Sequence, residues 1–300
     1  MPTPWWEPRP HKVDRPLTKH QVRESSVIVQ WVILVPGGAW DCEGVTVERW
    51  CERVWAAHPA LLVLGATGSA PGRATWRSGA MTGADLGVPH AWGVQVTAGA
   101  AVPDVAEAAA ALGWCHERGG EQGWLVSVPE SLVGAAPWRG LLLAGRTGVF
   151  ATDAPTAATM DAPAPDGVEL ELAASRDDVV AGYGGWMNDL PLARLLVTDE
   201  DLARPDRRFL VARLDGRVVG SAFVWWAEGT GYLSGIGVVE ELRGRGIGRA
   251  LTGRAAYIAA LGHDGTAPDV VWMHATVNGA ALYSRMGLTL VDTEVQLGPG

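Results

Sequence analysis

The chain has 300 residues, of which 48% are hydrophobic and 19% charged, which is enough apolar material for two domains of about 150 residues. Its formal net charge of −9 disfavours nucleic acid as a partner, and its three cysteines lack metal-ligand spacing, so we expect no metal site. No apolar run approaches the roughly 18 residues that span a membrane, and the Pro- and charge-rich start lacks a signal-peptide core, so we expect a cytoplasmic protein without membrane contact.

The first half is less regular in pattern than the second. Residues 1–20 are expected to be a tail, followed by a domain over residues 21–160. The apolar run 60–64 predicts a strand, and residues 36–38 and 65–72 predict turns or loops. The second of these lacks the Lys-Ser/Thr of a phosphate-binding loop. The Pro- and Asp-rich residues 161–166 are expected to link this domain to a second one over 167–300.

The second half predicts an alternation of strands and helices. Asp215-Gly216 is a strong hairpin signal between two apolar runs. The expected order is strand 168–172, a helical region 176–196 interrupted near Gly184-Gly185, strands 208–213, 218–226 and 232–239, helix 250–261, strand 270–275, helix 279–286 and strand 289–297. This order indicates an α/β (α+β) domain with a mixed central sheet flanked by helices.

A glycine-rich turn lies between strand 232–239 and helix 250–261. Its sequence is Arg243-Gly244-Arg245-Gly246-Ile247-Gly248-Arg249. Such a turn directs backbone N–H groups outward at a helix N-terminus, and glycines allow a ligand to approach the backbone closely. The arginines add fixed positive charge. These residues therefore predict a site for a phosphate or pyrophosphate.

The two halves align at an offset of 142 residues. At this offset residues 93–96 fall on 235–238, and Gly145 falls on Gly287. Both segments then run strand, turn, Ala-rich helix and strand, which favours a tandem duplication of one fold. Chance matching of Gly and Ala in a chain rich in both is the alternative.

Two motifs in the second half carry a family resemblance. Residues 238–248, with the turn from Arg243 to Gly248, resemble the acyl-CoA-binding signature of the GCN5-related N-acetyltransferase (GNAT) family. Residues 278–288, with Asn278 and Tyr283, resemble that family's second signature, with Leu288 in the Phe place. The resemblance covers residues 167–297. It departs from the family pattern at Glu240, where a proline is common.

The resemblance implies an acyl-CoA N-acyltransferase fold, duplicated in tandem, and acetyl-CoA as cosubstrate. The Val238 N–H would polarise the thioester carbonyl as an oxyanion donor. The acceptor amine would attack directly, without a covalent enzyme intermediate. The residues expected to bind the cofactor are Ile236, Val238, Arg243, Gly244, Arg245, Gly246, Gly248, Arg249 and Asn278.

Three side chains are candidates for proton transfer. Tyr283 would protonate the departing thiolate, the alternative being a half-buried core tyrosine. His274 could act as a base through water on the substrate ammonium, although a hydrogen-bonded strand histidine is the more frequent role. Glu228 is a second base candidate, against a solvated loop carboxylate. No metal is expected to take part.

At the offset of 142 residues, the first half lacks the residues of the cofactor turn and the catalytic candidates. Residues 101–106 stand where 243–248 stand, with Asp104 in the place of Gly246, and Ala136 and Leu141 replace Asn278 and Tyr283. We therefore expect a degenerate acetyltransferase-like domain without a cofactor site. Eleven of the 15 tryptophans lie in this half and could form an interface, wall an acceptor pocket or simply fill the core.

The expected function is transfer of an acetyl group from acetyl-CoA to a primary amine of a small molecule. A non-catalytic acyl-CoA-binding sensor or scaffold and a protein-lysine acetyltransferase are the alternatives, together with transfer of a longer acyl group or decarboxylation of a malonyl thioester. The sequence leaves the acceptor, the acyl length and the oligomeric state open.

Overall fold

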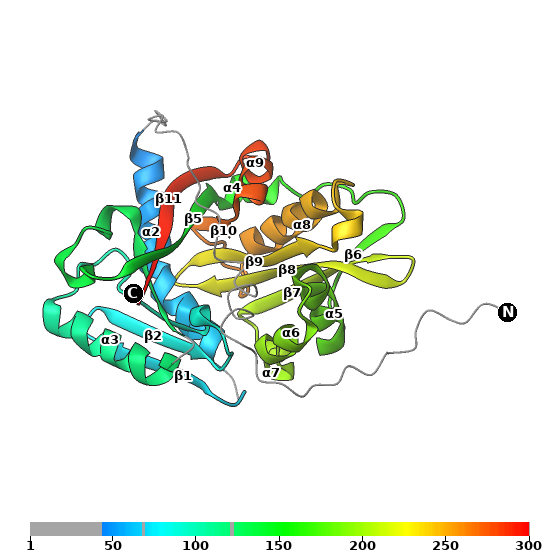
Figure 1. Cartoon of the computed structure of the whole chain (residues 1–300). Helices are drawn as coiled ribbons and strands as arrows, with labels where there is room; N and C mark the ends of the chain where they lie inside the picture. Colours follow the sequence, from blue (N-terminus) through cyan, green and yellow to red (C-terminus); the bar gives the residue numbers. More distant parts are fainter. Residues whose placement is uncertain (1–43, 68–69, 121–122, 300) are drawn as a thin grey trace, which may run out of the picture.

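A computed structural model describes residues 44–67, 70–120 and 123–299 (Figure 1). The expected tail 1–20, the turn 36–38 and four of the tryptophans lie outside the described residues. No helix in the described part combines the length and apolar character needed to cross a membrane.

The described strands form one mixed sheet that runs through both halves of the chain (Figure 1). The eleven strands lie in the order β1-β2-β3-β4-β11-β5-β10-β9-β8-β7-β6. Their bounds are β1 Arg73–Ser78, β2 Met81–Leu86, β3 Val94–Thr97, β4 Leu125–Pro129, β5 Leu142–Asp153, β6 Val168–Leu172, β7 Arg207–Leu214, β8 Arg217–Ala227, β9 Thr230–Val238, β10 Val270–Ala275 and β11 Thr289–Gly298.

Helices cover both faces of this sheet. In the second half α8 packs against β8 and β9 on one face, and α5 and α6 cover the other. The α-helices are α2 Gly44–Ala66, α3 Val105–Gly119, α4 Ala154–Ala158, α5 Arg176–Met187, α6 Leu190–Leu196, α7 Asp199–Ala203, α8 Ile247–Leu261 and α9 Val277–Arg285. Short 3-10 turns occupy Ala91–Gly93, Glu130–Leu132, Ala136–Trp138 and Glu240–Leu242.

The order of elements expected for the second half is confirmed, with one displaced boundary and one unexpected short helix, α7, between α6 and β7. The β7–β8 hairpin turns at Asp215 and Gly216, whose φ angles of 52° and 76° are those that its signal predicts. The helical region 176–196 breaks at Asn188, not at Gly184-Gly185. With φ 56°, Asn188 adopts the left-handed conformation that ends α5. Asp189 then caps the N-terminus of α6.

The prediction of a strand at residues 60–64 is wrong, because this run forms the last part of helix α2. The buried positions Val54, Trp55 and Leu61 repeat at helical spacing along one core cluster. Pro59 lies inside the helix and obscures the helical pattern, since proline is usually excluded from helix interiors.

Two strands interleave the halves of the chain. The C-terminal strand β11 lies between β4 and β5, antiparallel to both. β5 in turn pairs with β10, with Met273 opposite Phe150. Each half thus contributes a strand to the sheet region next to the other half, and residues of β5 and β11 stand close to those of β10.

Helices α3 and α8 stand at the offset predicted from the sequence. Val105 and Gly119 bound α3, and adding 142 to each gives 247 and 261, the bounds of α8. Each helix connects two parallel strands, β3 with β4 and β9 with β10. The match of elements extends beyond the few identities from which the offset was read.

Candidate active site

Strands β9 and β10 pair over a short distance and then separate. Their parallel ladder runs from Thr230–Val270 to Leu233–Met273 and ends there, while β9 continues to Val238. A bulge opposite β8 begins at Gly235, whose φ is 57° and whose Cβ, if present, would lie 2.5 Å from the Phe223 ring. The bulge bends β9 away from β10 and opens a gap between the two strands.

The backbone of Val238 faces this gap. The Val239 N–H donates to the Val219 carbonyl on β8 at 2.9 Å. Successive N–H groups of a strand point to opposite edges, so the Val238 N–H points toward the side where β10 has separated. The Val238 carbonyl lies on that side and accepts from Nε of Arg243 at 3.1 Å.

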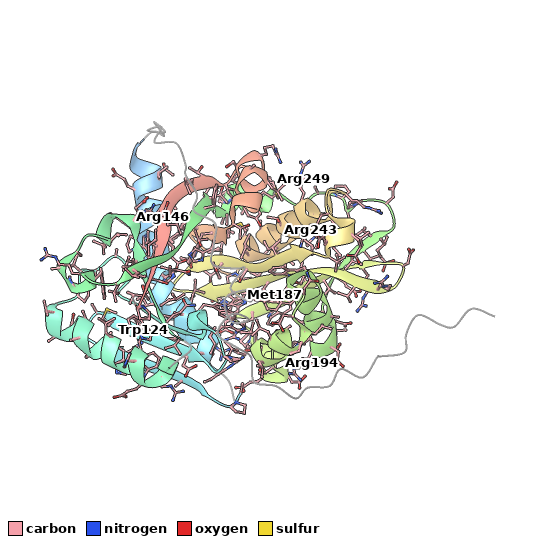
Figure 2. All side chains as sticks on the ribbon, in the orientation of Figure 1. Trp124, Arg146, Met187, Arg194, Arg243 and Arg249 are labelled. Carbon is pink, nitrogen blue, oxygen red and sulfur yellow. The ribbon has the colours of Figure 1, made fainter. Side chains whose placement is uncertain are left out.

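The glycine-rich turn leads from β9 into α8. Gly244 and Gly246 have φ angles of 78° and 85°, which favour glycine, and a Cβ at Gly244 would meet open space. Gly246 is the N-cap of α8, and no side chain caps this terminus. Residues 243–246 and Arg249 are exposed, and Figure 2 shows Arg243 and Arg249 beside α8. The first turn of α8 therefore presents free N–H groups and positive charge.

The corresponding helix terminus of the first half is closed. Asp104, at the place of Gly246, caps α3 by accepting from the Glu107 N–H at 2.7 Å, and Glu107 returns a bond to the Asp104 N–H at 3.2 Å. This capping box occupies two N–H groups, those of Asp104 and Glu107, whose counterparts in α8 have no side-chain cap. It also places two carboxylates where an anion would bind.

Tyr283 lies buried in the last turn of α9. Its ring packs edge-on against Phe150 and over Gly279, where a Cβ would lie 3.1 Å from the phenol oxygen. The hydroxyl is therefore directed toward the N-terminal end of α9, next to the end of β10. Burial raises the pKa of Tyr283 to about 12, so the phenol stays protonated at neutral pH.

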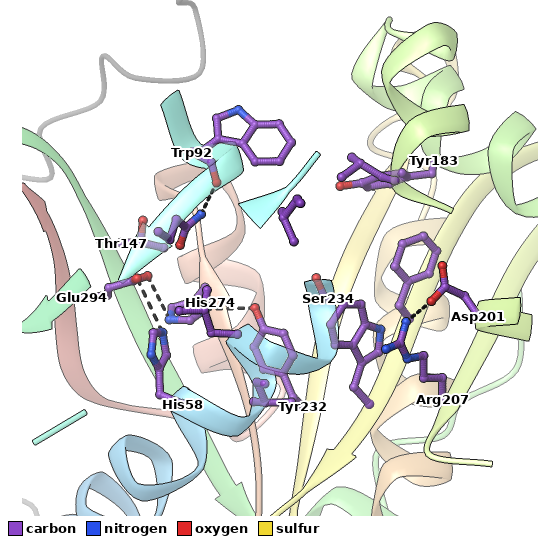
Figure 3. A pocket seen from close by; sticks show the side chains of 18 of the residues that line it. His58, Trp92, Thr147, Tyr183, Asp201, Arg207, Tyr232, Ser234, His274 and Glu294 are labelled. Atoms are coloured by element: carbon purple, nitrogen blue, oxygen red, sulfur yellow. Dashed lines mark hydrogen bonds and ion pairs between the residues drawn. The ribbon is translucent and has the colours of Figure 1, made fainter. Parts of the chain in front are cut away.

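A cavity of about 330 Å³ lies on the sheet face opposite α8 (Figure 3). Tyr232 and Ser234 of β9 and Trp272 and His274 of β10 line it, while Leu233 between them is buried in the core beneath α8. Ser234 and His274 are the first residues after the β9–β10 ladder ends. The cavity therefore meets the gap between the two strands at these residues.

A buried polar cluster forms one wall of the cavity (Figure 3). Glu294 of β11 places Oε2 3.0 Å from Nε2 of His274 and Oε1 3.6 Å from Nε2 of His58 on α2. The other ring nitrogen of His274, Nδ1, lies 2.9 Å from the Tyr232 hydroxyl. The cluster joins β9, β10, β11 and α2, and thus both halves of the chain.

The charges of this cluster follow from its burial. Burial alone would raise the pKa of Glu294, but His274 and His58 outweigh it and hold the pKa well below its usual range. Burial lowers the pKa of His274 below its usual 6.5, against the effect of Glu294. At neutral pH Glu294 is therefore ionised and His274 is neutral. The two histidines and Glu294 also have ligand atoms within 4.8 Å of one another, as a metal site requires.

The structure does not bring every candidate together. Glu228 lies exposed in the β8–β9 turn with φ 49°, where its carbonyl accepts from Arg53, and it does not line the cavity. This turn precedes Thr230, at the opposite end of β9 from Val238. The backbone of Asn278 lies in α9, but its side chain is outside the described part of the structure.

His58 and Glu294 are functional candidates that the sequence did not reveal. His58 lies in the segment expected to precede a strand, and Glu294 lies in the closing strand without a neighbouring motif. A charged residue at a core-facing position of a strand was the available signal for Glu294, which is 5% exposed. The pairing of β11 with β4 and β5, which brings the two side chains together, has no local sequence signature.

The geometry agrees with comparisons to known proteins. Residues 205–288 match the family model "Acetyltransferase (GNAT) domain". The chain carries a domain of the GNAT acetyltransferase family. Within that match lie β9, the glycine-rich turn, α8 and Tyr283, so the sequence resemblance is confirmed.

Relatives of this GNAT domain share part of the sequence or the fold. A mycothiol acetyltransferase of Nocardiopsis dassonvillei is 36% identical over 116 residues, which cover 33% of this chain and only 33% of that protein. A GCN5-related N-acetyltransferase from Kribbella flavida superposes with a TM-score of 0.59 at 19% identity, over 83% of this chain and 95% of that one. A tandem GNAT protein from the clavulanic acid biosynthesis pathway gives 0.55 at 17% identity, over 84% and 94%. These structures share the acyl-CoA N-acyltransferase fold.

Proposed function

We propose that this chain is an acetyl-CoA-dependent N-acetyltransferase that acts on a primary amine of a small molecule. The observation that carries the proposal is the junction of three features. The β9–β10 ladder ends after Leu233–Met273, Ser234 and His274 just beyond it line the cavity, and β9 continues to the turn before the uncapped N-terminus of α8; we take these features as one path. Such a path accommodates a long phosphorylated cosubstrate at one end and an acceptor at the other.

The residues of this path fit acetyl-CoA. The N–H groups of Gly244, Gly246, Gly248 and Arg249 would hold the pyrophosphate, with Arg243 and Arg245 adding charge. The pantetheine arm would lie along β9 from Ile236 to Val238, in the gap left by β10. The Val238 N–H would then polarise the thioester carbonyl, an interaction that in enzymes contributes about 3 kcal/mol.

The acceptor amine would attack the thioester carbon directly, forming the amide as the C–S bond breaks. Tyr283 would deliver its phenol proton to the leaving thiolate. The proton lost by the amine would reach Nδ1 of His274 through the Tyr232 hydroxyl, 2.9 Å away, and Glu294 would stabilise the imidazolium. The process needs no covalent enzyme intermediate.

The domain assignment remains part of the proposal. Residues 167–300 would form the catalytic domain, and 21–160 a related domain whose cofactor site is lost. The capping box of Asp104 and Glu107 supports this loss, because it closes the helix terminus that corresponds to the cofactor turn. The first half would instead contribute α2, and with it His58, to the acceptor cavity.

The test is a thiol-release assay with acetyl-CoA and a panel of primary amines, combined with calorimetric titration of CoA. We expect micromolar CoA binding and amine-dependent thiol release. CoA binding without turnover on any amine would favour a non-catalytic sensor. Turnover on lysine peptides but on no small amine would favour a protein acetyltransferase.

A further inference from the structure

The cavity contains two buried carboxylates, of which one, Asp201, pairs with arginines and the other, Glu294, does not. Asp201 at one side is hydrogen-bonded to Arg207, and its second oxygen, Oδ2, lies 3.7 Å from Nη1 of Arg73. Arg207 in turn donates to Thr67 and stacks 4.9 Å from the centre of the Trp225 ring. This side of the cavity therefore carries no net negative charge for a ligand to compensate.

Glu294 at the other side has a different environment. Its ion-pair partners are His58 and His274, and among the described residues no arginine or lysine pairs with it. The Glu294 residue is only 5% exposed, and its two partners are imidazoles, which carry no fixed charge. A buried carboxylate without a fixed cation is costly, and a bound cation removes that cost.

A buried ring nitrogen adds to this observation. Nδ1 of His58 makes no hydrogen bond in the described structure, whereas Nε2 of His274 faces Glu294 at 3.0 Å. The Tyr232 and Trp272 rings lie beside them, with centroids 4.6 Å apart. Carboxylate, imidazole nitrogens and aromatic faces together are suited to a primary ammonium group.

The remainder of the cavity favours an apolar body. Leucines 61 and 196 and the rings of Phe209, Phe223 and Trp225 also line the cavity, and the charged residues Asp201 and Arg207 on the other side are already bonded to each other. Several polar lining groups, such as Ser234 and Thr147, carry no charge and lie near the cluster. A volume of about 330 Å³ is at the lower end of the range for small-molecule sites, so one compact ligand fits.

We infer that Glu294, with His58 and His274, anchors the ammonium group of the acceptor, and that the acceptor is a compact primary amine with an aromatic or branched apolar body. The inference rests on the proposed function for the identity of this cavity as the acceptor site. A polyhydroxylated amine would leave its hydroxyl groups unpaired against the apolar side chains that line the cavity, which disfavours it. His58 would give the first half a direct part in acceptor binding.

The first test compares three ligands on the full chain by calorimetry, with and without saturating CoA. The ligands are 2-phenylethylamine, its neutral analogue 2-phenylethanol, and glucosamine. We expect 2-phenylethylamine to bind at least about tenfold more tightly than either of the others, because the alcohol lacks the charge and the sugar lacks the apolar body. Equal binding of amine and alcohol, or tighter binding of glucosamine, would overturn the inference.

The second test uses Glu294→Gln, with Glu130→Gln as the matched control. Glu130 has the same chemistry but pairs with Arg146 on the surface, where its side chain is 52% exposed. We expect Glu294→Gln to lose the preference for amine over alcohol while it still binds CoA, and the control to keep that preference. If Glu294→Gln fails to fold, the comparison of amine and alcohol on the unaltered protein still decides the question.

A third measurement separates this inference from two others. Repeating the amine titration with a chelator and with added Zn²⁺ tests the cluster as a metal site. Loss of amine binding on chelation would replace the ammonium anchor by a metal. Thiol release with glucosamine but not with 2-phenylethylamine would support the acetyltransferase function but contradict the proposed class of acceptor. Tight binding of 2-phenylethylamine without thiol release would support the ammonium site but contradict the acetyltransferase function.

Discussion

The ring of Tyr283 lies over Gly279, so closely that a Cβ at position 279 would be 2.6 Å from Cε2 of the ring. A methyl group there forces the phenol out of its place at the end of β10. We expect Gly279→Ala to lower kcat for acetyl transfer by about tenfold or more, with little change in the KM for acetyl-CoA, because a small misplacement of a catalytic group is costly. Steady-state thiol release measures both constants.

Gly113 provides the control for this change. It lies inside α3, where a Cβ would meet nothing within 4 Å. Gly113→Ala should leave kcat unchanged and raise the free energy of unfolding by up to about 1 kcal/mol, since alanine favours helix over glycine. Gly279→Ala with normal kcat would show that the position of the Tyr283 ring does not matter for turnover.

The phenol of Tyr283 itself is the second target. We expect Tyr283→Phe to reduce kcat by about a hundredfold, because a positioned acid contributes roughly 10²–10⁴ to such steps. With the pKa of Tyr283 raised to about 12, its proton is retained through alkaline pH, so Tyr283 should cause no fall in kcat between pH 7 and pH 10. Thiol release followed across that range tests both statements.

Tyr257 on α8 is the matched residue for Tyr283→Phe. Tyr257→Phe removes the same hydroxyl from the second-half domain, on a helix that does not line the cavity, and should leave kcat unchanged. Full turnover of Tyr283→Phe over the whole pH range would remove Tyr283 from the mechanism and leave it a core residue against Phe150.

Much of the second half is predictable from sequence because its signals are local. The hairpin at Asp215-Gly216 and the turn at Gly244 and Gly246 both require positive φ angles. Glycine adopts such angles without strain, so its presence at these places is a local signal. Helix α2 escaped prediction because Pro59 and the apolar run after it imitate a strand. There the tertiary packing of Trp55 and Leu61 on the sheet decides the conformation.

The candidate site likewise has a part that local sequence reveals and a part that it does not. The cofactor turn is contiguous in sequence, so its chemistry could be recognised from seven residues. The cluster of His58, His274 and Glu294 joins positions 236 residues apart, from 58 to 294, and depends on the insertion of β11 between β4 and β5. Glu228, by contrast, was near a suitable strand in sequence but lies at its far end in space.

The contrast between Gly246 and Asp104 gives a third prediction. Gly246→Asp would introduce a carboxylate at the open N-terminus of α8, where it would repel the pyrophosphate, and the φ of 85° at this position would add backbone strain that Asp104, with φ −70°, does not carry. We expect CoA to bind at least about tenfold more weakly, measured by calorimetry. The unfolding midpoint of the apo protein checks that the variant is folded.

The reciprocal variant Asp104→Ala tests whether one site or two bind CoA. It should leave CoA affinity unchanged and lower the free energy of unfolding by about 1 kcal/mol, the usual effect of losing a helix N-cap. CoA binding that is abolished by Asp104→Ala and unaffected by Gly246→Asp would assign the cofactor to the first half of the chain.

The buried cluster makes stability depend on pH. Because the pKa of His274 is lowered below 6.5 in the folded state, the unfolded chain binds more protons as the pH falls through 6.5, and folding is weakened there. The free energy of unfolding should therefore decrease below pH 6.5, by at most about 1.4 kcal/mol per pH unit for one such group. Glu294, with its lowered pKa, adds a second decrease below its usual 4.5.

Urea unfolding between pH 7 and pH 5 measures the first of these effects by itself. Asp178 and Asp206 also have lowered pKa values, but they act below their usual 3.8 and so do not contribute in this window. His274→Gln lowers stability at every pH because it removes a partner of Glu294, yet it should flatten the slope between pH 6.5 and pH 5. An unchanged slope would mean that His274 is not neutral in the folded protein at pH 7.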